Sequence, residues 1–106
     1  MSLLIHNVFF RLKDRSEAAV TAMTAACRKY LTVQPGIAYF TAGPLAKDLT
    51  RDVNVTDWDV ALLVVFADRA SHDLYQDDPT HNQFIAENKA NWDSVRVFDS
   101  LAERPF

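Results

Sequence analysis

The sequence predicts an α+β fold in which a four-stranded antiparallel sheet carries its helical segments on one face only. The first observation is an apolar run at residues 58–66, which would be apolar on both faces of an extended segment. One face would hold Val60, Leu62, Val64 and Phe66, and the other Ala61, Leu63 and Val65. The second is the order of strand-type and helix-type patterns, β-α-β-β-α-β. Because the predicted helices can cover only one face of the sheet, a second copy of the chain is expected to cover the other face.

The composition is that of one ordinary globular domain spanning residues 1–106. Hydrophobic residues make up 49% of the chain and charged residues 24%, which excludes a disordered or low-complexity class. The net charge of −3, with dispersed basic residues, argues against nucleic acid as a partner. Residues 1–10 are apolar but contain His6 and Asn7 and are too short to span a bilayer, so no membrane partner is expected. The protein is therefore expected to be cytoplasmic, and its single cysteine, Cys27, to be a buried free thiol.

The first strand is expected at residues 3–12. Its two faces would carry His6, Val8, Phe10 and Leu12 on one side and Ile5, Asn7, Phe9 and Arg11 on the other. A helix is expected to begin at Asp14, which has with Glu17 the spacing of a capping pair. Its apolar stripe comprises Val20, Met23, Cys27, Tyr30 and Leu31. Pro35 and Gly36 end this helix, and residues 37–42 form the second strand.

A long polar segment, residues 45–57, separates the second strand from the central strand at residues 58–66. Connections in small domains are usually about 4 to 6 residues long. Three interpretations remain open for this segment: a lid, an arm that clasps a dimer, and a plain extension of a β-hairpin.

The second helical region is predicted to be broken in the middle. Asp68 can cap a short helix that contains Leu74 and Tyr75. Asp78 and Pro79 interrupt it, and Pro79 suits the first position of a new helix. In that helix one face would carry His81, Phe84, Ile85 and Asn88, with Trp92 one turn further. The last strand is expected at residues 94–100, with Val95 and Val97 opposite Arg96 and Phe98.

These elements together predict the ferredoxin-like arrangement with one uncovered sheet face. The uncovered face would hold Ile5, Phe9, Ala61, Leu63, Val65 and Phe98. A contiguous apolar patch of this kind marks an interface, and a two-fold contact lets one patch serve as its own partner. We therefore expect a homodimer that closes into a dimeric α+β barrel.

Several short motifs occur along almost the whole chain in a characteristic order. They are His6-x-Val8-x-Phe10-x-Leu12-Lys13, Pro35-Gly36-Ile37, Asp59-Val60-Ala61-Leu62, Phe66-Ala67-Asp68, Tyr75 with Pro79-x-His81-x-x-Phe84, and Val97-Phe98-Asp99. With them the chain resembles the stress-responsive A/B barrel (Dabb) domain family of the dimeric α+β barrel superfamily. The resemblance implies a sheet-to-sheet homodimer and a pocket between helices and sheet in each protomer.

Within that family the sequence is similar to olivetolic acid cyclase, a plant polyketide cyclase. The catalytic tyrosine and histidine of that enzyme match Tyr75 and His81, and its first-strand pocket histidine matches His6. The resemblance thus implies that these three residues are catalytic. This chain departs from the enzyme at Val60 and Asp78, where the cyclase has histidines, so the substrate does not carry over.

The residues themselves favour the same pair. Tyr75 and His81 are six positions apart, and the break at Pro79 lets both turn toward one cavity. A phenol can donate a hydrogen bond to a carbonyl oxygen while a neutral imidazole removes a carbon-bound proton. The pocket is predicted to be lined by Val8, Phe10, Met23, Cys27, Leu62, Phe84, Trp92, Val95 and Val97. It would bind or cyclise a small aromatic or polyketide-like ligand without a cofactor.

The sequence is compatible with other functions. The same residues suit a non-enzymatic stress or small-ligand-binding protein, in which His81 and Tyr75 only pack, and His6 is a core-edge histidine. Asn7 and Trp92 invite comparison with cofactor-independent monooxygenases of the superfamily. No metal site is predicted, because the three histidines lack ligand spacing and His72, beside Asp73, is expected to be solvated.

Overall fold

The computed structural model describes residues 2–31 and 34–103 of the 106-residue chain. Four strands, three α-helices and a short 3₁₀ helix are found in these ranges. They are β1 (Ser2–Leu12), α1 (Glu17–Leu31), β2 (Ile37–Pro44), β3 (Val60–Phe66), α2 (Arg69–Asp77), α3 (Pro79–Asn88), η1 (Lys89–Asn91) and β4 (Trp92–Glu103). No helix within these ranges has both the length and the apolar character needed to cross a membrane.

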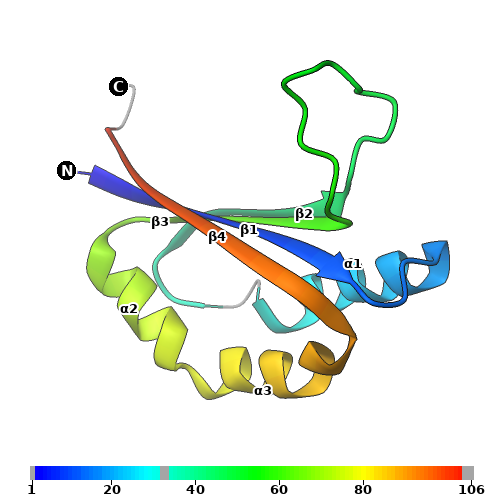
Figure 1. Ribbon diagram of the computed structural model, residues 1–106. Coiled ribbons are helices and arrows are strands. Elements are labelled where there is room, and N and C mark those ends of the chain that lie inside the picture. Colours follow the sequence, from blue (N-terminus) through cyan, green and yellow to red (C-terminus); the bar gives the residue numbers. More distant parts are fainter. Residues whose placement is uncertain (1, 32–33, 104–106) are drawn as a thin grey trace.

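The four strands form one antiparallel sheet in the order β2-β3-β1-β4. All three α-helices lie on the same face of this sheet (Figure 1). The predicted ferredoxin-like α+β fold is therefore confirmed.

Strand β3 lies inside the sheet, and its side chains alternate in burial as its sequence predicts. Val60, Leu62, Val64 and Phe66 are 0–3% exposed and pack beneath the helices, whereas the alternate residues are half-buried. Burying each of these four side chains stabilises the fold by about 1.5–3 kcal/mol. Strand β1 repeats the pattern, and its register places His6 beside Val64 and Val8 beside Leu62. The two central strands thus supply the apolar floor on which the helices pack.

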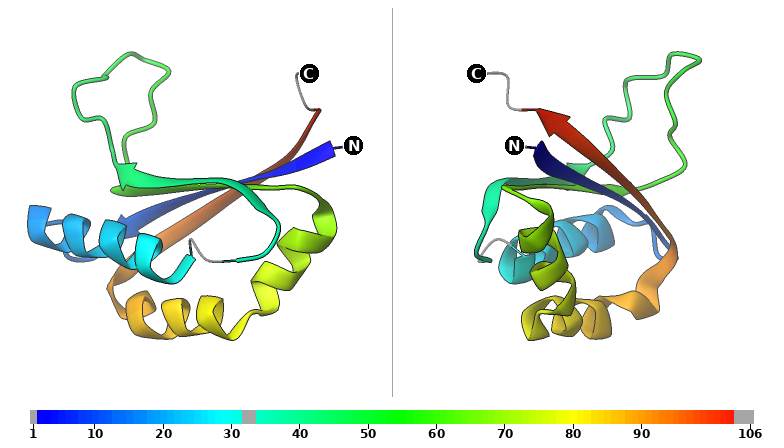
Figure 2. Two further views of the ribbon diagram at one scale, coloured as in Figure 1. Left: turned by 180° about the vertical axis from the view of Figure 1, so that it is seen from behind. Right: turned by 90° about the vertical axis from the view of Figure 1, so that its left-hand side faces the viewer.

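No helix formed by residues 2–31 or 34–103 lies over the opposite sheet face. The patch predicted there, Ile5, Phe9, Ala61, Leu63, Val65 and Phe98, ranges from half-buried to exposed, and Phe98 is 57% exposed. The β2–β3 connection rises on this same side, away from the helices (Figure 2). The connection therefore does not lie over the space between helices and sheet and is not a lid there; its position is compatible with both a dimer arm and a plain hairpin extension.

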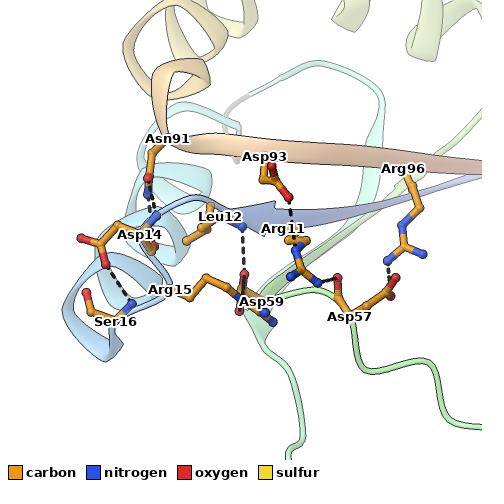
Figure 3. Close-up of polar contacts among 10 residues, drawn as sticks. All are labelled: Arg11, Leu12, Asp14, Arg15, Ser16, Asp57, Asp59, Asn91, Asp93 and Arg96. Carbon is orange, nitrogen blue, oxygen red and sulfur yellow. Dashed lines mark hydrogen bonds and ion pairs between the residues drawn. The ribbon is translucent and has the colours of Figure 1, made fainter.

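Helix α1 starts differently from the prediction. Ser16 directly precedes the helix, and its hydroxyl oxygen accepts a hydrogen bond from the Ala19 amide at 3.2 Å. Asp14 instead accepts from the Ser16 amide at 3.0 Å and shapes the turn before the helix (Figure 3). Ser16 is therefore the N-cap, and the assignment of Asp14 to that position was wrong. Sequence spacing alone did not separate two capping-type residues two positions apart.

A buried carboxylate, Asp59, connects the start of β3 to the end of β1 through hydrogen bonds. It accepts from the Leu12 amide at 2.8 Å and from Arg15 Nε at 3.1 Å (Figure 3), while its own amide donates to the Phe10 carbonyl at 2.7 Å. Asp59 and Trp58 therefore precede the strand, which begins at Val60, two residues later than predicted.

The break between α2 and α3 occurs where it was predicted. Asp68 caps α2 by accepting from the Ser71 amide at 2.8 Å. Asp78 ends α2 and also caps α3, because its carboxylate accepts from the Thr80 amide at 2.7 Å. Pro79 is the first residue of α3. Trp92, expected to follow the helix stripe, instead opens β4 after the 3₁₀ turn.

Gly36 fixes how closely α2 approaches the segment before β2. Its backbone has φ of 82°, in the left-handed region that glycine adopts without strain. A Cβ atom there would also lie 2.1 Å from the Ser71 hydroxyl oxygen. The Gly36 carbonyl accepts from the Ala67 amide at 2.9 Å, just before α2 begins. Glycine at this position therefore sets the place of the helix that carries Tyr75.

Candidate active site

A cavity of about 160 Å³ lies between the sheet and the helices. Its wall is mainly apolar and includes a few polar groups. The lining residues are His6, Val8, Phe10, Leu31, Leu62, Tyr75, Gln76, His81, Phe84, Ile85, Trp92, Val95 and Val97. An engineered cavity of about 150 Å³ in another protein holds benzene. The space here therefore suits one aromatic ring or a group of similar size.

The cavity opens along β4, the edge strand. Val95 and Val97 point to the helix side of the sheet and line the cavity, yet they are 40% and 49% exposed. An edge strand has a neighbour on one side only, and here the helices leave its apolar side chains partly uncovered. A ligand larger than one ring could extend outward along this strand.

Most of the residues predicted for the pocket line this cavity, and two do not. Met23 and Cys27 are buried in the core instead. Met23 Sδ accepts a hydrogen bond from the Trp92 indole at 3.4 Å, so it supports the cavity wall from behind. Burial raises the pKa of the Cys27 thiol to about 12, which leaves it protonated and unreactive. Leu31, Gln76 and Ile85 also line the cavity, although the sequence did not indicate them.

Tyr75 and His81 lie side by side on the cavity wall. Their ring centroids are 4.6 Å apart, and the end of α2 at Asp77 with the restart at Pro79 brings them together. Tyr75 Oη and His81 Nδ1 are both buried, and neither has a hydrogen-bond partner among the described residues. An unpartnered buried polar group costs about 1–3 kcal/mol. Tyr75 and His81 therefore each bring a polar group with unused hydrogen-bonding capacity to the lining of this cavity.

The surroundings hold both groups in their neutral forms. Burial raises the pKa of Tyr75 well above its usual range, so its hydroxyl keeps its proton. Burial also lowers the pKa of His81, and charge on His6 and His72 lowers it further. The Asp78 carboxylate and a hydrogen bond with the Gln76 backbone oppose these effects without overcoming them. At neutral pH the site therefore holds a hydroxyl donor beside an imidazole acceptor.

His6 is a third polar group of the cavity and is tied to β4. Its Nδ1 lies 2.6 Å from Asp99 Oδ1, and the two residues are register partners on β1 and β4. Its ring lies 6.1 Å from the Tyr75 ring and 5.3 Å from the His72 ring. His72 was expected to be solvated, but only 14% of its side chain is exposed, so that expectation was wrong. The α2 helix turns it inward, against Phe66 at 5.5 Å.

Asn7 and Trp92 do not form a joint site. Asn7 pairs with Leu63 and Phe98 on the uncovered sheet face, whereas Trp92 lines the cavity on the helix side. The sheet separates them.

The family model of the stress responsive A/B barrel domain, Dabb, matches residues 4–102. The chain belongs to this family. The match covers β1 to β4 and thus all the elements that build the cavity.

Solved structures with the same fold include three of particular interest. A Dabb family protein with a ferredoxin-like fold from Mesorhizobium loti is 20% identical, covers 98% of this chain and 100% of its own, and has a TM-score of 0.79. A dimeric ferredoxin-like protein of unknown function from Thermobifida fusca is 17% identical, with coverages of 95% and 92% and a TM-score of 0.77. The hydroxynitrile lyase of Passiflora edulis is 19% identical, with coverages of 98% and 96% and a TM-score of 0.75. No functionally curated protein matches this chain.

Proposed function

We propose that this Dabb protein is a cofactor-free acid–base catalyst for a small carbonyl compound with an aromatic or short polyketide-like body. The observation that carries the proposal is that two neighbouring lining residues of one mainly apolar cavity, Tyr75 and His81, each have a buried polar atom, Oη and Nδ1, without a partner among the described residues. A packing role alone would leave both groups uncompensated at a cost of about 1–3 kcal/mol each. A ligand carbonyl and its neighbouring C–H group would compensate both.

The proposed step is proton abstraction next to a carbonyl. Tyr75 donates a hydrogen bond to the carbonyl oxygen, and His81 Nδ1 takes the proton from the adjacent carbon. The electron pair of the broken C–H bond moves into the resulting enolate, whose oxygen Tyr75 stabilises. In a cyclisation, the enolate carbon would attack a second carbonyl of the same ligand, the π electrons of that carbonyl would move to its oxygen, and the resulting alkoxide would take the proton held by His81. General-base participation of this kind contributes a factor of about 10² to 10⁴.

The volume of the cavity limits the size of the ligand that can bind inside it. About 160 Å³ accommodates one ring, while ligand sites for drug-sized molecules usually measure about 300–1,000 Å³. We place the reacting ring inside, beside Tyr75 and His81, and any alkyl tail outside along β4. His6, held by Asp99, would orient a second polar group of the ligand. The hydroxynitrile lyase structure supports only the general point that the fold accommodates lyase chemistry in another protein, since 19% identity shows the fold alone.

Deuterium exchange tests this proposal directly. Acetophenone fits the one-ring limit and has exchangeable protons next to its carbonyl. In D₂O, the protein should accelerate loss of the methyl proton signal in NMR spectra. Tyr75→Phe and His81→Gln should each abolish the acceleration, while Tyr39→Phe, a change at a 58% exposed tyrosine, should leave it intact. Unaltered exchange in both site variants would remove the catalytic proposal.

A non-enzymatic ligand carrier is the second candidate, and the mainly apolar lining of the cavity favours it. Saturable binding of acetophenone without any exchange would support this function, because the pocket would then be occupied but not catalytic. Absence of both binding and exchange would count against both functions for ligands of this size.

We also infer that the chain works as a homodimer through its uncovered sheet face. The exposed Phe98 and its half-buried neighbours form a patch that water would cover in a monomer. The Thermobifida fusca protein of the same fold is described as dimeric. The β2–β3 connection lies on this same side of the sheet, and its exposed Val53 and Val55 could contact a second copy of the chain.

Sedimentation velocity at low micromolar concentration tests the dimer. Phe98→Arg should convert the protein to a monomer, because it places a charge within the apolar contact. Leu74→Arg is the matched control: Leu74 is 71% exposed but belongs to α2 on the other side of the sheet, so association should not change. A monomeric wild-type protein would contradict the inference.

A further inference from the structure

We propose that His6, His72 and Asp99 bind a divalent transition-metal ion at the end of the cavity where β1, β4 and α2 meet. Each residue offers one ligand atom, and these atoms lie within 4.8 Å of one another. The three residues come from three elements that are far apart in the sequence. This explains why the spacing of histidines in the sequence gave no indication of a metal site.

The architecture brings these side chains together without distortion. His6 and Asp99 are paired across β1 and β4, and both project toward the helices. Their Nδ1 and Oδ1 atoms already lie 2.6 Å apart. His72 reaches the same place from α2, with its ring 5.3 Å from that of His6 and edge-on to Phe66. The backbone register and the packing of α2 therefore fix all three positions.

The donor set indicates which metals can bind. Two imidazoles and one carboxylate suit Zn²⁺, and they also form the 2-His-1-carboxylate set found with Fe²⁺. Ligand bonds of about 2.0–2.2 Å place neighbouring donor atoms roughly 3.0–3.6 Å apart. His6 and Asp99 would separate slightly, with the ion replacing the proton between them, and His72 would move inward. The Asp99 side chain is 44% exposed and has room for this adjustment.

A supporting carboxylate already orients one of the proposed ligands. His72 Nδ1 lies 3.0 Å from Asp73 Oδ1, and Arg69 Nε lies 3.2 Å from the same oxygen. Metal-binding histidines commonly donate their second ring N–H to such a carboxylate, which fixes the tautomer and the ring orientation. This contact leaves Nε2 of His72 as the nitrogen that can face an ion. Without a metal, the same residues would form two separate histidine–carboxylate pairs.

The proposed ion would lie beside the cavity that holds Tyr75 and His81, because His6 also lines that cavity. The metal proposal does not rest on the acid–base function, and an ion bound here would replace the ligand-orienting role proposed for His6, because His6 and Asp99 would then be metal ligands. It is tested by metal binding alone, and a failure of acetophenone exchange would leave it unaffected.

Cobalt titration provides the test. Chelator-treated protein is titrated with Co²⁺, whose visible absorption reports ligand geometry, and Zn²⁺ is then added as a competitor. We expect saturation at one ion per chain and displacement of Co²⁺ by Zn²⁺. His72→Gln and Asp99→Asn should each weaken binding at least tenfold, and Asp73→Asn by about 10- to 100-fold. His81→Gln, a change at a histidine of the same cavity outside the proposed ligand set, should bind Co²⁺ as the wild type does.

The variants are chosen to keep the protein folded. His72 and Asp99 are at least partly exposed, unlike His6, and circular dichroism would verify each variant. As a second measurement, Zn²⁺ should raise the melting temperature of the wild type but not that of His72→Gln. Equal Co²⁺ affinity in the wild type and His72→Gln, or no saturable binding to the wild type, would overturn the proposal.

Discussion

Replacing Tyr75 with Phe should make the protein more stable while disabling its site. The change removes one hydroxyl oxygen that is buried and has no partner among the described residues. It leaves the ring in place, with its contacts to Phe66 at 5.0 Å and to His81 at 4.6 Å. An unpartnered buried hydroxyl costs about 1–3 kcal/mol, and we take the lower end of this range. We therefore expect the free energy of unfolding to rise by about 1 kcal/mol.

Urea unfolding followed by circular dichroism measures this change. The slope with denaturant should stay constant, because the area exposed on unfolding hardly changes, so the gain appears as a higher midpoint. In thermal unfolding it corresponds to an increase of about 4 °C or more in Tm for a domain of this size. Tyr39→Phe is the matched control: its hydroxyl is on a 58% exposed side chain, so stability should change by no more than about 0.5 kcal/mol.

The opposite sign would refute the reasoning. If Tyr75→Phe lowers the free energy of unfolding by about 1 kcal/mol, its hydroxyl makes a stabilising hydrogen bond in the free protein. Tyr75 would then be a structural residue, and the argument that its hydroxyl awaits a ligand would fail. A stability gain together with lost acetophenone exchange is the expected signature of a functional group that the fold maintains at a cost.

Three further predictions concern two residues that position the elements around the site and the pH dependence of stability. Gly36→Ala should lower stability by about 2–4 kcal/mol, because it adds left-handed backbone strain to a 2.1 Å approach to Ser71, whereas Gly43→Ala, with open space around its Cβ, should be close to neutral. Asp59→Ala should cost about 2–3 kcal/mol by unpairing the Leu12 amide. The pKa of His81 is lower in the folded protein than its usual 6.5, so near this pH the folded state binds fewer protons than the unfolded state. The free energy of unfolding should therefore fall as the pH decreases through about 6.5, and it should fall less in His81→Gln.

Equilibrium unfolding measures all three. The pH series should be run between pH 7.5 and 5, where the carboxylates with depressed pKa values remain ionised in the folded state. Equal losses for Gly36→Ala and Gly43→Ala would contradict the account of Gly36. A neutral Asp59→Ala would show that the Leu12 amide finds another partner. Parallel pH curves for the wild type and His81→Gln would show that His81 does not account for the acid response.

The order of elements, the sheet and the direction of its side chains were predictable from the sequence. Alternation along β1 and β3 is a property of extended backbone, so each strand's own residues determine which side chains face the helices. Pro79 likewise breaks the helix through its own ring and missing amide proton. Both effects act within a few residues and leave a direct trace in the sequence.

The convergence of side chains from different elements was decided by the tertiary structure. The pairing of His6 with Asp99 depends on the β1–β4 register, and the inward turn of His72 depends on how α2 packs near Gly36. Which of Asp14 and Ser16 caps α1 depends on the path of the preceding turn. Likewise, the displacement of Cys27 from the cavity wall and the size of the cavity follow from packing among helices and sheet. Such distances arise only when several elements are placed at once, because no single segment of the chain contains both partners.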